Sequence, residues 1–238
     1  YTQHDHINEA LDCFERMQNE GLCRDSFTFS CIVKACGRIR NIEKGKKVHE
    51  MVIVNEGMLE NDNVLGNALV DMYAKCGAIG RARDVFDQLR VRSVIAWTAL
   101  ITGYVQHGPV GEALRCFRQM QKEGVSPNNV TFMCILKACS ILGSLEVGED
   151  IDAELRKQGL LQKDVMLGTS LVDMYAKCGA LDKAQDVLQR LPTRNVVSWS
   201  ALIAGYTQHG QGGEALKCFK KMQDDGVSPD VVTYICVL

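Results

Sequence analysis

The sequence lacks an apolar run long enough to cross a membrane as a helix. It also lacks an excess of charge of either sign, because 27 lysines and arginines face 29 aspartates and glutamates and leave a formal charge of -2. That balance argues against a strongly basic surface for nucleic acid. The sequence has no initiator methionine and no leader segment, so we expect targeting information to be absent from it or to have been removed.

The cysteines lack the spacing of a metal site or of a disulfide framework. There are 11 of them, but no C-x-x-C pair and no histidine at a ligand spacing. All except Cys23 instead recur in register, in the sets Cys13, Cys116 and Cys218; Cys31, Cys134 and Cys236; Cys36 and Cys139; and Cys76 and Cys178. This recurrence favours a small apolar side chain reused at equivalent packing positions in a reducing compartment, over zinc ligands or disulfides. We therefore expect no metal ion and no other cofactor.

What the sequence does have is an internal period. The segment DMYAKCGA occurs at residues 71–78 and again at residues 173–180, an offset of 102 residues. The segments around it, 63–93 and 165–195, each read as two short helices broken at a Lys-Cys-Gly turn. A fixed period indicates a solenoid of stacked repeats with a continuous core, and this overrides the one or two globular domains that the length alone suggests.

A second pattern occupies residues 94–128 and 196–230, and its later part is also present in residues 1–25. In the first complete copy, the apolar residues from Ala113 to Met120 follow the spacing of one face of an amphipathic helix. Gly124 and its counterpart Gly226 stand where a left-handed helix stop is expected. Each complete copy is therefore predicted to be a helix–turn–helix repeat.

A third pattern, with Thr-Phe followed by C-I-[VL]-K-A-C, occupies residues 26–62 and 129–164, and residues 231–238 begin another copy. Aligning the two complete copies places one extra residue within Met51–Asn55. We call these the long repeats, 94–128 and 196–230 the middle repeats, and 63–93 and 165–195 the short repeats. One repeat of each kind fills the 102-residue period.

The three patterns together predict an all-α fold, a single solenoid over residues 1–238 with about thirteen short helices. The expected repeats are residues 1–25, 26–62, 63–93, 94–128, 129–164, 165–195, 196–230 and 231–238. The first and last are incomplete, so apolar end faces are expected to drive end-to-end self-association. Trp97 and Trp199 are expected to pack between repeats and not to stack on a ligand. The small residues Ala74, Ala176 and Gly103 are expected to let helices approach closely.

These motifs resemble those of one plant protein family. VSWSALIAGYTQHG with EALKCFKKMQDDGVSPD, VTFMCILKACSILG and LGTSLVDMYAKCGALDKA resemble the P, L and S motifs of PLS-class pentatricopeptide repeat (PPR) proteins, and the resemblance covers the whole chain. Tetratricopeptide repeats keep a constant period of about 34 residues, whereas the repeat lengths here alternate. The resemblance implies a right-handed α-solenoid that binds single-stranded RNA, one base per repeat, in a mitochondrion or plastid. It further implies the recognition array of a C-to-U RNA editing factor.

The resemblance also assigns the base-reading residues, as the polar residue just inside the first helix of each repeat and the last residue of the same repeat. The pairs are Ser30/Asp62, Asn67/Ser93, Thr98/Asn128, Met133/Asp164, Thr169/Asn195 and Ser200/Asp230. The family's code implies adenine for Thr/Asn, guanine for Ser/Asp, cytosine for Asn/Ser and at best a weak uracil preference for Met/Asp. The last five pairs then imply 5′-C-A-(U)-A-G-3′, with the N-terminus toward the RNA 5′ end. The extra residue in the first long repeat leaves the register of its pair open.

Each of these side chains also has a purely structural interpretation. Hydroxyl groups near helix starts serve as caps, and Asn and Asp are common in turns. The apolar residues three positions before the readers are expected either to sandwich bases between repeats, as the resemblance implies, or to pack between repeats. These apolar residues are Val64, Ile95, Val130, Met166 and Val197.

Two lysines, Lys75 and Lys177, lie near the end of the first helix of each short repeat, where the resemblance implies an approach to RNA phosphate. Lys34 and Lys137 recur in the long repeats as well. The alternative for each is an ordinary solvated surface charge. Against 29 acidic residues, so few lysines imply few phosphate contacts, a shallow salt dependence and weak binding.

The sequence shows no catalytic constellation. His107 and His209 recur in a Gln-His-Gly turn with no carboxylate or cysteine in a triad-like pattern, and we interpret them as turn residues. The H-x-E and P-C-x-x-C signature of nucleotide deaminases is absent, so any deaminase activity would lie outside this chain. We therefore expect a binding module and not an enzyme. The alternatives are a helical scaffold for protein partners and a factor for RNA stability or processing. The long repeats are implied to contact small organellar editing-factor proteins.

Overall fold

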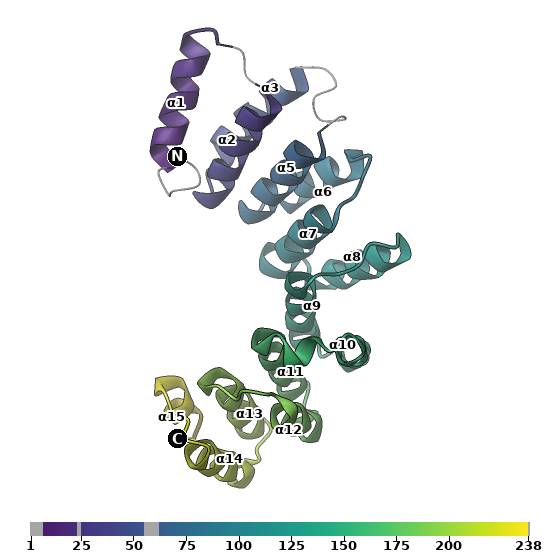
Figure 1. Cartoon of the computed structure of the whole chain (residues 1–238), viewed down its shortest axis with the longest axis vertical. Helices are drawn as coiled ribbons and strands as arrows, with labels where there is room; N and C mark the ends of the chain where they lie inside the picture. Colours follow the sequence, from purple (N-terminus) through teal and green to yellow (C-terminus); the bar gives the residue numbers. More distant parts are fainter. Residues whose placement is uncertain (1–6, 23–24, 55–61, 238) are drawn as a thin grey trace. The chain divides into compact units, whose positions relative to one another are not determined.

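The computed structural model describes residues 7–22, 25–54 and 62–237, and within those residues all regular structure is helical. The expectation of an all-α fold is confirmed. The chain divides into two compact halves, residues 1–128 and 129–238 (Figure 1). Among the described helices, none is long and apolar enough to cross a membrane.

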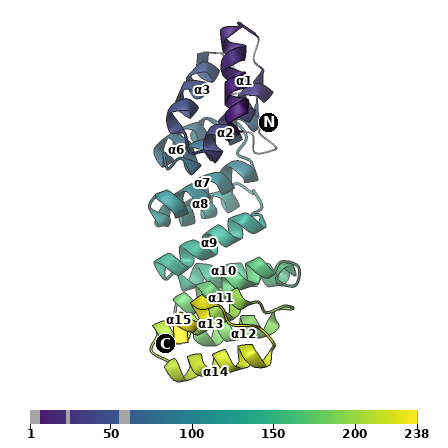
Figure 2. The ribbon, with the colours of Figure 1, turned by 90° about the vertical axis from the view of Figure 1, so that its left-hand side faces the viewer.

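The N-terminal half is built from pairs of helices. Its elements are α1 (Ile7–Asn19), α2 (Ser26–Arg38), α3 (Ile42–Val54), α5 (Asn63–Lys75), α6 (Ile79–Gln88), α7 (Val94–His107) and α8 (Val110–Lys122). The first helices α2, α5 and α7 pack on one another in turn, and the second helices α3, α6 and α8 each pack on the first helix of their own pair. Within this half, each of these first helices therefore packs on its own second helix and on the first helix of a neighbouring pair (Figure 2).

The C-terminal half repeats this arrangement. Its elements are α9 (Asn129–Leu142), α10 (Leu145–Lys157), the 3-10 helix η2 (Leu160–Gln162), α11 (Val165–Lys177), α12 (Leu181–Arg190), α13 (Val196–Gln208), α14 (Gly212–Asp224) and α15 (Val231–Val237). Here α9, α11, α13 and α15 pack on one another in turn, and α10, α12 and α14 pack on α9, α11 and α13.

Each repeat start expected after the first repeat is the first residue of a helix. These helices are α2, α5, α7, α9, α11, α13 and α15. The division into repeats itself stays a prediction. Residues 1–6, Cys23 and residue 24 of the first repeat, Asn55 at the expected insertion, and Leu238 all lie outside the described residues.

Glycines end the helices where the sequence predicts it. Gly124 and Gly226 have φ angles of 73° and 74°, in the left-handed region that favours glycine. After α11, Gly179 has a φ of 78°, and the N–H of Ala180 donates to the Tyr175 carbonyl at 3.0 Å. These bonds satisfy carbonyls that the helix end would otherwise leave unpaired.

The tryptophans pack in the core as expected, with exposed fractions of 0% for Trp97 and 6% for Trp199. The Phe86 ring lies edge-on to Trp97, with 4.5 Å between ring centroids. Helices also approach as closely as the small residues predict. A Cβ added at Gly103 would lie 2.9 Å from the Cβ of Ala74, too close for any larger residue.

The cysteines behave as packing side chains. Cys36, Cys116, Cys139 and Cys218 are free and buried. Burial raises the pKa of Cys36 and Cys116 to about 11 and that of Cys139 to about 12. Thiols with such high pKa values are poor nucleophiles, so these positions serve the core.

One polar contact between helices differs between the two halves. In the N-terminal half, Nδ1 of His49 lies 3.0 Å from the Tyr73 hydroxyl. At the corresponding place in the C-terminal half, the Tyr175 hydroxyl donates to Oδ2 of Asp152 at 3.0 Å. Burial lowers the pKa of His49, so the imidazole is held in its neutral form.

Candidate nucleic-acid interface

The second residue of each first helix exposes an apolar side chain. The five expected from the sequence have exposed fractions of 48% to 60%, and they are Val64, Ile95, Val130, Met166 and Val197. About half of each side chain therefore lies in solvent and is not buried between repeats. The same place in α2 and α15 holds Phe27 and Val232, with exposed fractions of 72% and 57%. The sequence analysis missed these two, although each also lies three positions before the fifth residue of its helix. We call all seven the exposed apolar series.

In five of the six expected reading pairs, the fifth residue of the first helix is polar and buried. The buried ones are Ser30, Asn67, Thr98, Thr169 and Ser200, with exposed fractions of 2% to 9%. Met133 occupies the same place in α9 and is half-buried. A buried polar side chain needs a hydrogen-bond partner, so the partners of these residues decide what they can offer to a ligand.

The last residue of a repeat caps the helix that follows. Backbone N–H groups in the first turn of that helix donate at 2.7 to 3.3 Å to the side chains of Asp62, Ser93, Asp164, Asn195 and Asp230. Each of these side chains satisfies N–H groups that have no partner within the helix. The caps are therefore the last residues of the repeats, whereas the capping role was expected for the hydroxyls of Thr98, Thr169 and Ser200 inside the helices; the Thr98 hydroxyl donates to the Val94 carbonyl instead. Asn128, the last residue of the first middle repeat, is exposed.

The structure brings two of the expected reading pairs together. Oγ of Ser93 donates to Oδ1 of Asn67 at 3.0 Å. Oγ of Ser200 lies 2.7 Å from Oγ1 of Thr233, which in turn donates to Oδ1 of Asp230 at 2.7 Å. Because Thr233 gives its hydrogen to Asp230, the Ser200 hydroxyl is the donor to Thr233. The bonds from Thr233 hold the pKa of Asp230 below its usual range, so this carboxylate is ionised at neutral pH.

The threonine hydroxyls of the two Thr/Asn pairs, Thr98 and Thr169, differ in their hydrogen bonding. Oγ1 of Thr98 donates to the Val94 carbonyl at 2.7 Å, one helical turn back. Oγ1 of Thr169 is buried and has no hydrogen-bond partner in the part of the chain that the structure describes. An unsatisfied buried hydroxyl costs about 1–3 kcal/mol. Thr169 would therefore gain from a ligand that supplies a partner.

In the long repeats the last residue bonds to the first residue of the repeat. Oγ of Ser26 donates to Oδ2 of Asp62. Nδ2 of Asn129 donates to Oδ2 of Asp164 at 2.8 Å. Within the described residues no hydrogen bond joins Asp62 to Ser30, whose hydroxyl is buried without a partner. The sequence analysis missed Ser26 and Asn129, because only the packing of one repeat on the next brings them to these carboxylates.

The two lysines expected at phosphates are each paired with an aspartate one turn earlier. Nζ of Lys75 lies 2.6 Å from Oδ2 of Asp71, and Nζ of Lys177 lies 2.8 Å from Oδ2 of Asp173. Both lysine side chains are about half exposed, at 48% and 50%. Exposed pairs of this kind contribute about 0.3–0.5 kcal/mol, so a phosphate can replace the aspartate at small cost.

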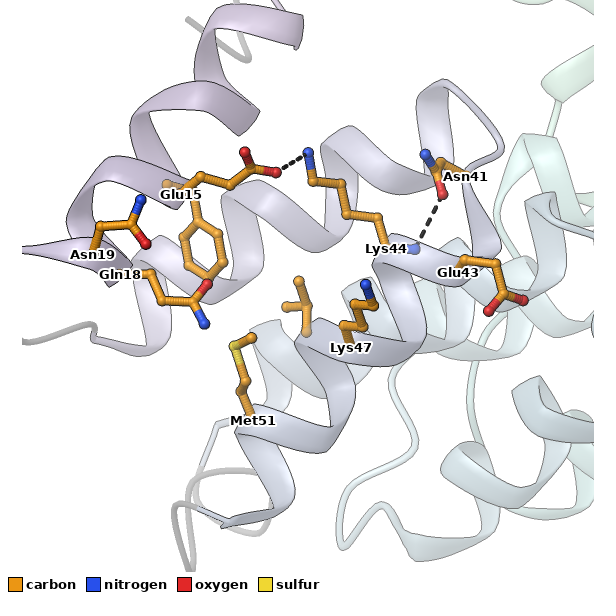
Figure 3. Close-up of a pocket in the computed structure, with 10 residues that line it drawn as sticks. Glu15, Gln18, Asn19, Asn41, Glu43, Lys44, Lys47 and Met51 are labelled. Carbon is orange, nitrogen blue, oxygen red and sulfur yellow. Dashed lines mark hydrogen bonds and ion pairs between the residues drawn. The ribbon is translucent and has the colours of Figure 1, made fainter. Parts of the chain in front are cut away.

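A separate hollow of about 540 Å³ lies beside α1 and α3 (Figure 3). Phe14, Val48 and Met51 form its apolar part, and Nζ of Lys44 pairs with Oε1 of Glu15 at 2.7 Å. None of the expected site residues lines it. Across the described residues, no group of three or more His, Cys, Asp or Glu side chains could hold a metal ion.

The chain matches known repeat families over most of its length. The PPR repeat family matches residues 92–140 and 194–238, and the PPR repeat matches residues 1–22, 67–94 and 169–196.

Relatives in Arabidopsis thaliana match the whole chain or nearly so. Pentatricopeptide repeat-containing protein At2g33680 is 39% identical over 238 residues, which are 100% of this chain and 32% of that protein. The chloroplastic protein At4g18520 is 38% identical over 98% of this chain and 37% of its own length. The mitochondrial protein At1g06140 is 37% identical over 100% of this chain and 42% of its own length. The chain thus spans about a third of the length of the relatives it matches.

The fold of the chain is also similar to that of a solved pentatricopeptide repeat protein. The crystal structure of pentatricopeptide repeat protein PPR10 from maize superimposes with a TM-score of 0.74 at 18% identity, over 99% of this chain and 34% of that one. PPR10 in complex with an 18-nt psaJ RNA element gives a TM-score of 0.73 at 19% identity, over 99% of this chain and 35% of that one. The helical-repeat architecture expected from the sequence is thereby confirmed. From its repeat matches, its relatives and its fold, the chain belongs to the pentatricopeptide repeat family.

Proposed function

We propose that this chain binds single-stranded RNA and reads one base per repeat. The observation that carries the proposal is the exposed apolar series, in which one side chain per repeat stands three positions before the fifth residue of the first helix, and that fifth residue is buried in five of the seven helices. Exposed apolar side chains that gather on one surface mark interaction sites, and this series leaves one such side chain at the same place of each repeat. Unpaired bases are flat and largely apolar on their faces, so they suit such a series. The complex of maize PPR10 with RNA supports the same conclusion.

Each repeat offers two kinds of contact to a base. The second residue of the first helix supplies an apolar surface for the base face. The fifth and last residues supply hydrogen-bonding atoms for the base edge. In the second short repeat, Nδ2 of Asn195 has no partner among the described residues, since the capping bond falls on Oδ1. In the repeat after it, the ionised Asp230 is an acceptor, which suits the N–H donors of guanine.

From the reading pairs we propose a base sequence for the RNA target. Thr98/Asn128 and Thr169/Asn195 take adenine, Ser200/Asp230 takes guanine, Asn67/Ser93 takes cytosine, and Met133/Asp164 has at best a weak preference for uracil. The proposed target of these five repeats is 5′-C-A-(U)-A-G-3′. The Ser93–Asn67 bond and the Ser200–Thr233–Asp230 chain support the pairing of fifth with last residues.

Phosphate contacts are few in this proposal. Lys75 and Lys177 are the candidates, and each first has to exchange its aspartate for a phosphate. Lys34 and Lys137 are exposed and have no ion-pair partner in the described ranges. A handful of such contacts gives a shallow dependence of affinity on salt.

We further propose that the chain is part of the recognition array of a C-to-U RNA editing factor of the PLS class, acting in a mitochondrion or plastid. The support is the fixed order of long, short and middle repeats, together with relatives named as chloroplastic or mitochondrial. A role in RNA stability or processing uses the same binding surface. A protein scaffold is the second candidate, favoured by Ile141 and Leu142 of the second long repeat, which are 54% and 47% exposed. Small editing-factor proteins are the partners proposed there.

Fluorescence anisotropy tests the RNA proposal with two oligonucleotides. One contains 5′-CAUAG-3′, and the other has both adenines changed to cytosine. A well-placed pair discriminates by about 1–3 kcal/mol, so the first is expected to bind at least about fivefold more tightly. Equal affinity for the two would refute base reading, and a pure scaffold would ignore the RNA sequence while still binding its protein partner.

A further inference from the structure

The carboxylates that end the two long repeats have both oxygens occupied within the protein. Oδ1 of Asp164 accepts from the N–H groups of Met166 and Leu167 at 2.9 and 3.3 Å. Its Oδ2 accepts from Nδ2 of Asn129 at 2.8 Å. This second bond joins the first residue of the repeat to the last.

The other long repeat has the same arrangement with a different donor. Oδ1 of Asp62 accepts from the N–H groups of Val64 and Leu65 at 2.7 and 3.1 Å. Its Oδ2 accepts from Oγ of Ser26. Ser26 and Asn129 are the first residues of α2 and α9. Two different polar side chains thus make the same bond at the same place.

The short and middle repeats lack this bond. Their first residues are Asn63, Val94, Val165 and Val196. A valine side chain cannot donate. Asn63 is exposed, and among the described residues its side chain makes no hydrogen bond to Ser93. In the second short repeat, Nδ2 of Asn195 is without a hydrogen-bond partner among the described residues.

We propose that Asn129, and Ser26 in the first long repeat, withdraw the last carboxylate from base reading, so that a long repeat accommodates any base. A base edge that approached Oδ2 of Asp164 would have to displace the Asn129 amide or share that oxygen with it. A hydrogen bond to an ionised group is among the stronger ones in a protein, so the exchange brings no net gain for any of the four bases. The fifth residue of this repeat is Met133, whose thioether is only a weak acceptor. The first residue of a repeat is then a third specificity-determining position. This inference rests on the proposed RNA-binding function.

Three variants of the whole chain test the inference. Asn129→Val removes the bond and copies the valine that begins α7, α11 and α13. Asn129→Ser restores a donor of the kind that Ser26 provides. Asn63→Val removes the same side chain at the same place of a repeat in which no such bond exists. Circular dichroism before binding establishes that all three remain folded.

Each protein is measured by fluorescence anisotropy against four oligonucleotides, 5′-CANAG-3′, in which only the middle base changes. For the wild type, the Asn129→Ser variant and the Asn63→Val variant, we expect the four dissociation constants to agree within about twofold. For Asn129→Val we expect a spread of at least about fivefold, the lower end for one base contact. A fivefold spread already present in the wild type, or no larger spread in Asn129→Val than in Asn63→Val, would overturn the inference.

A second measurement separates this failure from a failure of the proposed function. Oligonucleotides with cytosine in place of the adenines opposite Thr98/Asn128 and Thr169/Asn195 are measured alongside. If these bind more weakly while the middle base has no effect in Asn129→Val, the function stands and the inference is wrong. If they bind as well as the original, or if no RNA binds, base reading itself is wrong and the inference falls with it.

Discussion

The role of the exposed apolar series is separable from packing by one substitution, Ile95→Ala. Ile95 is the second residue of α7 and is 60% exposed, so most of its side chain is available to a base. Full burial of an isoleucine side chain contributes about 1.5–3 kcal/mol. The exposed part of the side chain that alanine lacks then contributes about 1 kcal/mol to binding. Its loss in Ile95→Ala raises the dissociation constant about fivefold.

The assay is anisotropy with oligonucleotides that carry each of the four bases at the affected position, followed by thermal denaturation of the free protein. Stacking on an apolar side chain is tolerant of sequence, so the loss is expected to be nearly equal for the four bases. The melting temperature is expected to stay within about 2 °C of the wild type, because an exposed side chain contributes little to the core.

Ile101→Ala on the same helix is the matched control. Ile101 is fully buried, with an exposed fraction of 0%, and its truncation is expected to cost about 2–5 kcal/mol and to lower the melting temperature by at least about 4 °C. If Ile95→Ala also lowers the melting temperature by several degrees and leaves RNA affinity unchanged, Ile95 is a packing residue and the reasoning fails.

Three further outcomes are expected. Thr98→Ser combined with Asn128→Asp copies the Ser200/Asp230 pair and is expected to move the preference at that base from adenine to guanine by about fivefold or more; an unchanged preference in anisotropy would contradict the assignment of this pair. The pKa of His49 is lowered on folding, so the stability due to its neutral form is present above its unfolded pKa of about 6.5 and is lost as the pH falls from there through the folded pKa. Urea denaturation at a series of pH values checks this, with His49→Gln expected to reduce the dependence and an identical dependence in both proteins counting against it. Leu188→Phe is expected to place its ring in the hollow of about 270 Å³ beside Trp199, edge-on to the indole as Phe86 is to Trp97, and to raise the melting temperature by about 2–4 °C; a lower melting temperature would mean that the ring does not fit.

The fold was predictable because each repeat carries its own local signals. Asp62 and Asn195 cap helices that begin where the repeats were expected to begin. Gly124 and Gly226 end helices in the left-handed conformation that the sequence suggested. These signals act over a few residues, so they can be read from one stretch of chain. Repetition at a fixed offset then implies that the stretches stack.

The candidate site was predictable in position but not in its bonds. The resemblance placed Asn67 and Ser93 in one pair, and the structure joins them at 3.0 Å. It did not indicate that Asn129 bonds to Asp164, or that Thr233 lies between Ser200 and Asp230. Periodicity shows which residues share a face of a helix. It does not show which atoms of different repeats come within hydrogen-bonding distance.

By itself, the sequence determined that this chain is a series of short helices with polar residues at regular places, and it predicted their grouping into repeats of three lengths, since capping and amphipathic spacing are local properties. Only the tertiary structure decided which apolar residues stay in solvent. Ile95 and Ile101 belong to the same apolar helix, yet one is 60% exposed and the other 0%. The physical reason is that burial depends on the neighbouring helices that cover a face, and in a solenoid these neighbours come from the preceding and following repeats. Because no neighbouring helix covers most of the Ile95 side chain, this position is a candidate contact for an RNA base.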